Sequence, residues 1–578
     1  MNRIGYILKL KGIKQSWLCE KLGKSYNTIN NYVNNRSQPP IKTLYKIAEI
    51  LDITTAELIG NNDIKTKDSN VEKKDKLSHF HEKNVSHQER KKLGQFYTHQ
   101  ELVKYILNQI PVNSKSTILD PTVGAGAFLI SCLKDSKEIV NNLYGIEIDE
   151  VALNLCKENI KRTYKTINLQ NFICANVINS ELNDLFPKIS KEGGFDIIIG
   201  NPPYQNLKAK IDYNPDDEDY KKVISGIANS CTLILTKCLK FLKNNGYLGF
   251  VLPKNILRVE SFSGLRNHLA KECTLLKIID LGHYFKDVRG DQIIIIIQNK
   301  KPNLKNSKIK VGILNRSSTI DSLNYYTIEQ NGLCTNSFYP IYRNESIIKV
   351  ANKLLTITTK LSDYAEVFRG FSIGANNELI SKKNIANGYK IYRGDSISKF
   401  GIKYSLYFNS DIKKLDETKF KKLNRNKIIL QNLCSKEAGI TATISKEVEL
   451  NIDTVTNVVS DKLDNLFLLG ILNSNLANFF LLHIVFLSSN FSMHTDKQYI
   501  GQIPIKIPNK KTENSIKNIV FELLEINGER TEKYKLLFNQ LNKLIYNLYS
   551  INKEEELIIE KCLKETLSKK QYYGSENE

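Results

Sequence analysis

The sequence predicts a multidomain α/β protein: a small all-α head, a central doubly wound sheet, and a C-terminal α+β domain with a helical tail. Its 578 residues are too many for a single core. Between residues 91 and 300, short apolar strands alternate with segments long enough for crossover helices, which is typical of a parallel sheet. The regions on either side have a different periodicity, so they are expected to fold separately.

The first 60 residues are expected to form a compact helical unit, because apolar residues recur at helical spacing in four groups. These groups are Ile4, Ile7 and Leu8; Trp17, Leu18 and Leu22; Ile29 and Val33; and Leu44, Ile47, Ala48 and Leu51. Gly23 separates the second group from the third. Pro39-Pro40 precedes the fourth, where prolines suit a helix start. The second helix is expected at about 15–22 and the third at about 26–34.

Residues 61–90 are polar with few large apolar side chains, and we interpret them as a solvated linker. The central domain is expected over 91–335, with seven strands near 117–119, 143–146, 172–174, 197–199, 247–252, 278–281 and 293–297. The last domain is expected over 336–578. It contains strand-like segments at 368–380, 392–397, 427–436 and 453–459, and helical segments at 468–480 and 533–563.

Charge and cysteine usage narrow the class of protein. The net charge of +22 favours a polyanionic partner, nucleic acid first, and the head alone has nine basic and four acidic residues. A lysine-rich surface from an AT-rich genome is the alternative explanation. Ten cysteines without a CxxC pair predict reduced thiols and no metal site. No signal peptide is evident, and asparagines and a histidine interrupt the apolar stretch 466–487. We therefore expect a cytoplasmic protein without a membrane partner.

Three strand ends carry the groups that suit chemistry. After the first strand, DPTVGAGAF (120–128) places Gly124 and Gly126 where backbone can approach a ligand before a helix begins. The second strand ends at Glu147, 27 residues after Asp120, where a carboxylate can bind ribose hydroxyls. The fourth strand ends in NPPY (201–204), which offers an amide, a prolyl carbonyl and an aromatic ring to a planar amino group.

These motifs resemble a known family. GQFYT (94–98), DPTVGAGAF, GIEID (145–149), NPPY and HYFKDVRGD (283–291) occur in the order of the gamma class of DNA adenine-N6 methyltransferases, the TaqI-like enzymes. RGFSIG, YRGD and the helical tail are similar to that family's target-recognition region. KGIKQSWLCEKLGKSYNTINNYVNNRSQPP resembles a Cro/repressor-type helix-turn-helix, although a small protein-interaction bundle is an alternative for the head.

The resemblance implies a Rossmann-like seven-stranded methyltransferase domain that binds S-adenosylmethionine. It assigns cofactor contacts to Tyr97, Thr98, Asp120, Gly124, Gly126, Glu147, Ile148 and Asn176. Asn176 stands where many relatives have Asp; its carbonyl oxygen can accept from the cofactor's adenine, but its amide also donates. The alternatives are a packing role for the aromatic pair in GQFYT and a plain turn role for Asn176.

The implied reaction is methylation of a flipped-out adenine. Asn201 and the Pro202 carbonyl accept the amine hydrogens, and Tyr204 holds the base. Phe285 is the further candidate for base contact, with a core phenylalanine as its alternative. A strand cap is the alternative for Asn201. In the head, the resemblance implies that the major groove is read by Ser25, Tyr26, Asn27, Thr28 and Asn31.

The expected function is therefore a site-specific methyltransferase of a restriction-modification system, acting on double-stranded DNA. Its head would control its own transcription or add DNA affinity, and a restriction endonuclease encoded nearby is a candidate partner. Protein-glutamine and RNA guanine methyltransferases share NPPY but need neither a repressor-like head nor a large recognition domain. A repressor with an inactive methyltransferase-like body, and a fused restriction-methylation enzyme, are further alternatives. Residues 61–90 are too few for a nuclease domain.

Overall fold

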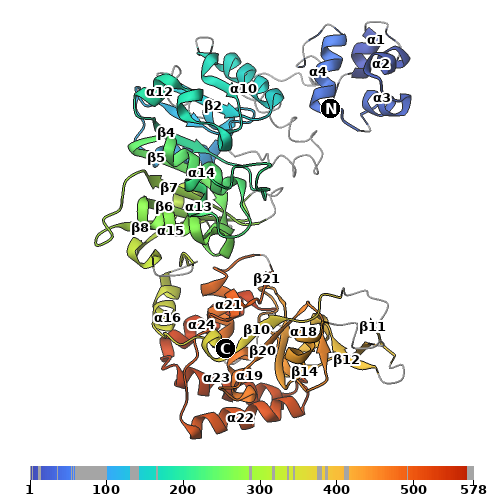
Figure 1. Cartoon of the computed structure of the whole chain (residues 1–578), viewed down its shortest axis with the longest axis vertical. Helices are drawn as coiled ribbons and strands as arrows, with labels where there is room; N and C mark the ends of the chain where they lie inside the picture. The colour runs from blue at the N-terminus through green and yellow to red at the C-terminus, as the bar shows by residue number, and fades with distance from the viewer. Residues whose placement is uncertain are drawn as a thin grey trace. The chain divides into compact units, whose positions relative to one another are not determined.

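The computed structural model describes most of the chain. It covers 100–130, 142–164, 167–284, 290–314, 319–334, 338–342, 345–373, 380–383, 388–408, 416–490 and 492–568, and in the head 2, 4–10, 13, 15–35, 37–51, 53, 55 and 58. The expected linker 61–90 lies outside the described residues. The chain divides into two compact units, Met1–Ser337 and Phe338–Glu578, and each is described by itself (Figure 1).

The head contains four described helices, α1 (Ile4–Leu10), α2 (Gln15–Leu22), α3 (Tyr26–Val33) and α4 (Ile41–Ile50). Their apolar faces share one core, in which Ile4, Leu18, Ile29, Leu44 and Ile47 are fully buried. Trp17 is a correction to the expected apolar pattern, because it remains 37% exposed. The eight-residue helix α2 buries the face that carries Leu18, and Trp17, the residue before it, lies outside that face.

A nine-stranded sheet forms the centre of the first unit, in the order β3-β2-β1-β4-β5-β7-β6-β8-β9 (Figure 1). The strands are β1 (Ile118–Asp120), β2 (Leu143–Glu147), β3 (Phe172–Cys174), β4 (Phe195–Gly200), β5 (Leu242–Pro253), β6 (Thr274–Gly282), β7 (Gln292–Gln298), β8 (Lys308–Ile313) and β9 (Tyr325–Glu329). The seven expected strands are all present, and β8 and β9 extend the sheet beyond the predicted seven. β7 lies antiparallel between β5 and β6.

Helices cover the sheet, and its central strands are therefore buried. These helices are α8 (Gln100–Asn108), α10 (Glu150–Thr163), α11 (Leu182–Leu185), α12 (Pro187–Lys191), α13 (Glu218–Val223), α14 (Ser230–Phe241) and α15 (Ser263–Glu272). Residues of α8 and α10 share a core with Ile197 and Ile199, while α14 contacts β5 and α15 contacts β6. Because β1 to β5 run parallel, their carboxyl ends meet at one edge of the sheet.

The second unit is built from small sheets and a group of helices. Its principal four-stranded sheet has the order β10-β20-β16-β18, and a second sheet has the order β11-β15-β12-β19. The strands are β10 (Glu366–Arg369), β11 (Ile380–Ser381), β12 (Tyr389–Tyr392), β13 (Ile397–Ser398), β14 (Gly401–Ile402), β15 (Leu406–Phe408), β16 (Lys427–Gln431), β17 (Leu433–Cys434), β18 (Ala442–Ser445), β19 (Leu450–Asn451), β20 (Val455–Val459) and β21 (Met493–His494).

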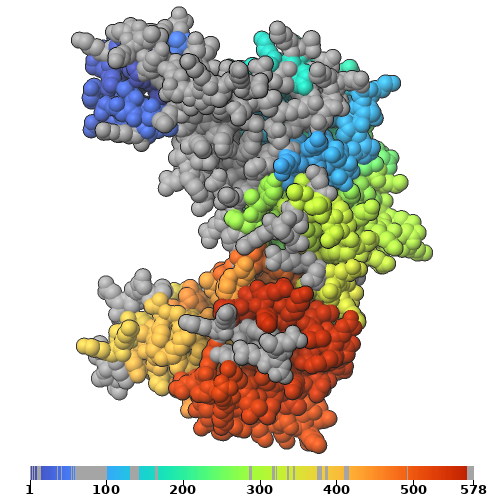
Figure 2. Space-filling view, turned by 180° about the vertical axis from the view of Figure 1, so that it is seen from behind, coloured from blue at the N-terminus to red at the C-terminus, as the bar shows by residue number. Residues whose placement is uncertain are grey.

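The helices of this unit are α16 (Glu345–Leu355), α17 (Leu361–Tyr364), α18 (Glu417–Leu423), α19 (Asn465–Asn473), α20 (Asn475–Phe479), α21 (Lys497–Ile500), α22 (Lys510–Glu525), α23 (Glu532–Leu548) and α24 (Lys553–Thr566). Figure 2 shows the strand-rich part in yellow and orange beside the C-terminal helices in red. The expected helical stretch 533–563 is interrupted at 549–552, and within the expected strand 392–397 residues 394–396 form a 3-10 turn.

The apolar stretch 466–487 is buried within this unit and continues from α20 into a π-helix, Phe480–Val485. Of the helices described here, none is by itself long and apolar enough to cross a membrane; a bent pair, Asn465–Asn473 with Asn475–Val485, passes on length and composition. Asn473 and Asn478 are fully buried and bond backbone atoms of the strand region. The asparagines that interrupt the apolar run therefore attach these helices to the small sheet.

Candidate active site

The glycine-rich turn after β1 has the backbone geometry that the sequence pattern predicts. Gly124 and Gly126 have φ angles of +52° and +92°, a region that L side chains rarely adopt. A Cβ on Gly126 would lie 2.9 Å from the Sγ of Cys156 in α10, whereas one on Gly124 would point into open space. Gly126 thus lets the turn pack against α10, and Gly124 leaves the turn accessible to a ligand.

Asp120 lies at the end of β1 and is 2% exposed. Its Oδ1 accepts a hydrogen bond from the Thr122 N–H at 3.0 Å, and a Cβ on Gly200 would lie 3.0 Å from the same oxygen. Burial raises the pKa of Asp120 to about 8; the nearby Glu147 adds to the rise and the Thr122 N–H opposes it. The carboxyl group is therefore largely protonated at neutral pH, and a cation bound beside it would favour its ionisation.

The two carboxylates in GIEID have separate roles. Glu147, 6% exposed, accepts from Gly124 N through Oε2 and from Ile148 N and Asp149 N through Oε1, at 2.9–3.1 Å. Burial raises the pKa of Glu147, and these backbone N–H groups counteract the rise. Asp149 instead caps α10 by accepting from Val151 N at 2.8 Å. Glu147 is thus the carboxylate that joins the ends of β1 and β2.

The end of β3 lies beside the end of β2. Ile148 is 62% exposed, and the Sγ of exposed Cys174 lies 3.7 Å from its carbonyl oxygen. The Oδ1 of Asn176 accepts from Ile178 N at 3.1 Å and caps a short 3-10 helix. One lone pair of Asn176 is therefore in use, which leaves its second lone pair and its amide N–H groups for a ligand.

The NPPY loop is held in a defined conformation at the end of β4. The Tyr204 hydroxyl lies 2.6 Å from the Oδ1 of Asn201, to which it donates, and 3.1 Å from the Val251 carbonyl of β5. The ring is half-buried while its hydroxyl lies inward, and burial raises the pKa of Tyr204 well above its ordinary value. The hydroxyl thus connects the NPPY loop to strand β5.

Ser230 is a positioning residue that the sequence motifs did not indicate. It lies at the start of α14 and is 3% exposed. Its Oγ accepts from Gln205 N at 2.8 Å and donates to the Pro203 carbonyl, while its own N–H bonds Gln205 O. A serine 26 residues beyond the motif cannot be assigned to it from spacing, because the helix that carries Ser230 is brought back by the tertiary fold.

A buried ion pair lies at the same edge of the sheet, where β5 and β6 end. The Lys254 Nζ is 2.5 Å from the Asp280 Oδ2, and the two residues are 3% and 4% exposed. Asp280 also accepts from Gly282 N, and Lys254 N donates to Asp291 O. These bonds anchor both ends of the segment that contains Phe285. Phe285 itself, and Tyr97 and Thr98, lie outside the described residues.

The head presents the predicted reading helix. Ser25 caps α3 by accepting from Thr28 N at 3.3 Å, and its Oγ lies 2.8 Å from the Thr28 hydroxyl. Tyr26 is 57% exposed and Asn27 is exposed, while Thr28 and Asn31 are partly exposed. The five predicted side chains therefore lie on or beside the first turns of one helix, as a groove-reading helix requires.

Three family profiles match the chain. "Helix-turn-helix" matches residues 4–58, "Eco57I restriction-modification methylase" matches 141–285, and "TaqI-like C-terminal specificity domain" matches 389–505. Several curated proteins to which this chain is similar are type II methyltransferases. The helix-turn-helix head, the methyltransferase-like α/β core and the TaqI-like C-terminal domain expected from the sequence are all confirmed.

The relatives are distant. The type II methyltransferase M.VspI of Vibrio sp. is 26% identical over 332 residues, covering 56% of this chain and 76% of that protein. M.AccI of Acinetobacter calcoaceticus is 26% identical over 346 residues, covering 56% of this chain and 57% of that protein. The type IIL restriction-modification enzyme MmeI, solved in complex with DNA, matches with a TM-score of 0.53 and 12% identity over 91% of this chain and 82% of its own; this likeness shows the fold.

Proposed function

We propose that the chain is a site-specific DNA adenine-N6 methyltransferase of a restriction-modification system that uses S-adenosylmethionine. The observation that carries the proposal is the convergence of the glycine-rich turn, Glu147 and the NPPY loop at one sheet edge, on strands β1, β2 and β4. Ligands bind at this edge of open α/β sheets. The type II methyltransferase relatives support the same reaction.

The residues at this edge fit the cofactor chemically. Glu147 would accept from a ribose hydroxyl with the Oε2 lone pair that the three N–H groups leave open, and exposed Ile148 would cover one face of the cofactor's adenine. The Asn176 amide would bond the adenine edge, and Asp120 would face the cationic methionine end. When bound, S-adenosylmethionine supplies an electrophilic methyl group on a sulfonium.

The chain's own part in the reaction is to orient the target amine. The exocyclic amine of adenine is a poor nucleophile because its lone pair conjugates with the ring. The Asn201 Oδ1 and the Pro202 carbonyl would accept the two amine hydrogens. The nitrogen lone pair would then point out of the ring plane. The exposed part of the Tyr204 ring would stack on a base flipped out of the duplex.

Two parts of the chain would bind DNA. The second unit, matched by the specificity-domain profile, would select the methylation site, and α3 of the head would read a separate operator. Since restriction-modification genes require a controlled methyltransferase level, the operator would lie at the protein's own promoter. A restriction endonuclease would then recognise the same site as the second unit.

The test is methylation of DNA by the full chain with S-adenosylmethionine labelled in the methyl group. Sequencing that detects modified bases then identifies the base and its flanking sequence. N6-methyladenine in one short motif is the expected result. Label on cytosine would leave the amine-methylation chemistry intact but reject adenine as the target. Absence of label in DNA, combined with saturable cofactor binding, would favour the repressor-like alternative.

A further inference from the structure

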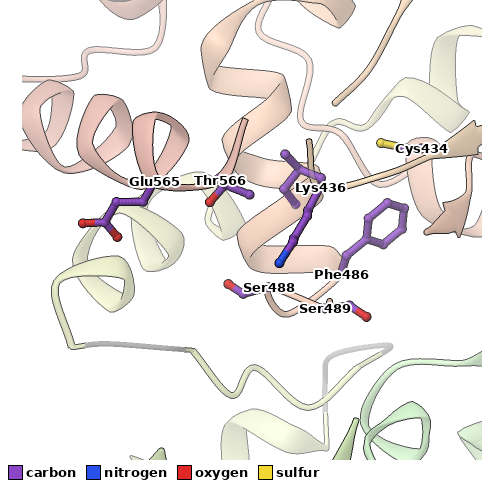
Figure 3. A pocket seen from close by; sticks show the side chains of 8 residues that line it. Cys434, Lys436, Phe486, Ser488, Ser489, Glu565 and Thr566 are labelled. Carbon is purple, nitrogen blue, oxygen red and sulfur yellow. The ribbon is translucent and has the colours of Figure 1, made fainter. Parts of the chain in front are cut away.

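An exposed histidine in the second unit is held by a partly buried network of polar side chains. β17 (Leu433–Cys434) and β21 (Met493–His494) pair antiparallel as a short two-stranded ribbon, with Leu433 opposite His494 and Cys434 opposite Met493. His494 is exposed and Leu433 is 54% exposed. Cys434 is buried and lines a small pocket with Phe486 and Thr566 (Figure 3). The ribbon thus has one inward and one outward-facing pair.

The network beneath His494 begins at Arg369 in β10. The Arg369 Nε and Nη2 each lie 2.6 Å from a carboxylate oxygen of Asp496, and this guanidinium holds the pKa of Asp496 below its ordinary value. Asp496 Oδ1 accepts from the Asn432 Nδ2 at 3.2 Å, and the same amide donates to the Thr456 hydroxyl at 2.8 Å. Asn432 is 3% exposed, so its amide is fully committed.

This network fixes the tautomer of His494. Because the Asn432 NH₂ group must face the Asp496 carboxylate, its Oδ1 faces the other way, toward the His494 Nδ1 at 2.6 Å. A carbonyl oxygen only accepts, so Nδ1 carries the proton. In the neutral ring Nε2 therefore has a free lone pair at the exposed end of the side chain. Four polar side chains, those of Arg369, Asp496, Asn432 and Thr456, thus orient one hydrogen-bond acceptor at the surface.

We propose, on the basis of the proposed function, that the β17–β21 ribbon enters the major groove and that His494 Nε2 accepts a hydrogen bond from the exocyclic amine of an adenine or cytosine in the recognition site. The major groove admits a two-stranded ribbon, and it displays the adenine N6 and cytosine N4 amines as donors. Leu433 supplies the adjacent apolar surface that suits a thymine methyl group.

The surroundings of the ribbon suit a nucleic acid. Lys436 follows β17 by two residues; its Nζ bonds the Asn490 Oδ1 at 3.0 Å and lies 4.0 Å from the Oε1 of Glu437, whose carboxylate it partly neutralises. Lys497 follows β21 and is exposed. The Asp496 carboxylate, the acidic group nearest in sequence to His494, is paired with Arg369. Amines at both ends of the ribbon can contact phosphates and position it, while the side chains between them face base edges.

The experiment is selection of bound sequences from a random duplex pool, together with the methylated motif, for the full chain and the variants His494→Ala and His494→Gln. His494→Ala is expected to lose preference at one base pair about tenfold or more, with the slope of log affinity against log salt unchanged. His494→Gln, whose side-chain carbonyl also accepts a hydrogen bond, should retain part of the preference at that base pair. Val448→Ala, at an exposed turn between β18 and β19 in the same unit, is the control.

Two results would overturn the base-reading role. One is an unchanged sequence preference at every position in His494→Ala. The other is a uniform loss of affinity with a salt slope lower by about one, which identifies a phosphate contact. The selected sequences do not depend on methyl transfer, so failure of the proposed reaction is seen separately as absence of methylated DNA. Sequences that the head selects are enriched equally by the wild-type chain and by every variant, so they do not affect the comparison.

Discussion

The sheet edge of the first unit and the ribbon of the second unit both orient polar side chains, but they do so in different ways. At the sheet edge, Asp120, Glu147 and Asn201 lie at strand ends, and nearby backbone N–H groups and a neighbouring tyrosine orient them. In the second unit, His494 of the ribbon is oriented by a series of hydrogen-bonded side chains that begins at Arg369. The bonded partners in this series lie up to 127 positions apart in the sequence.

The difference shows why chemistry is easier to find in a sequence than specificity. A strand end and the loop that follows it are contiguous, so the groups that act there form a motif. Side chains that read a base are oriented across a sheet by residues from several strands, and they leave no spacing to recognise. The predictions below test this contrast, in order of decreasing expected effect.

Asn201→Ala tests whether the loop alone carries the chemistry. The variant is expected to lower the rate of methyl transfer by about 10²-fold or more, because one of two oriented acceptors is lost, while cofactor binding remains. Rates at saturating DNA and cofactor measure it. Asn206→Ala, an exposed asparagine five residues further on, is the control. A near-normal rate in Asn201→Ala would remove Asn201 from the mechanism.

Glu147→Gln tests the carboxylate that joins β1 and β2. Affinity for S-adenosylmethionine should fall about tenfold to a hundredfold, because a charged acceptor is replaced by a neutral amide. Equilibrium titration of the cofactor measures the change. Glu150→Gln, exposed in the first turn of α10, provides the comparison. Equal affinity in the two variants would place the cofactor elsewhere.

Ser230→Ala tests the contact that connects the NPPY loop to α14. Two hydrogen bonds to partly buried backbone groups of the loop are lost, so a roughly tenfold decrease in kcat is expected with cofactor affinity unchanged. Thr236→Ala on the same helix removes a hydroxyl that bonds only the Thr232 carbonyl of that helix, and serves as control. If both variants lose stability alike and keep kcat, Ser230 is merely structural.

The buried Asp120 predicts a pH-dependent stability. Its pKa is about 8 in the folded state against an ordinary value of 3.8. The folded state therefore retains a proton between those values, and the free energy of unfolding falls as pH rises from about 4 to 8. The Tm of the wild type should therefore fall between pH 6 and pH 9 by a few degrees more than the Tm of Asp120→Asn, which has no ionisable group at this position. If the Tm values of the wild type and Asp120→Asn change equally with pH, the raised pKa of Asp120 is wrong.

Deletion of residues 1–60 should have the smallest effect on catalysis. If the head is regulatory, methylation in vitro persists and repression of a reporter from the protein's own promoter is lost. If the head only adds affinity through its charge, methylation falls at moderate salt in proportion to binding. A reporter that never responds to the full-length chain would exclude autoregulation. Asn31→Ala, which alters the reading helix α3 alone, separates loss of reading from loss of the whole head.

The sequence by itself determined most of the first unit and the kind of site that it holds. Short continuous apolar runs and glycines at strand ends act over a few residues, so the seven central strands, the α2–α3 pair and the positions of Asp120, Glu147 and Asn201 could be predicted locally. Even there, strands β8 and β9 and the exposure of Trp17 went unpredicted, because each depends on which surface a neighbouring element covers.

The tertiary structure alone decided how the functional groups are oriented. Ser230 reaches the NPPY loop because α14 packs back onto β5, and Asn432 fixes the His494 tautomer because β16, β20 and β21 bring Asp496, Thr456 and His494 around one amide. Hydrogen bonds act over about 3 Å, so their partners are set by packing across the core and leave no periodic trace along the chain.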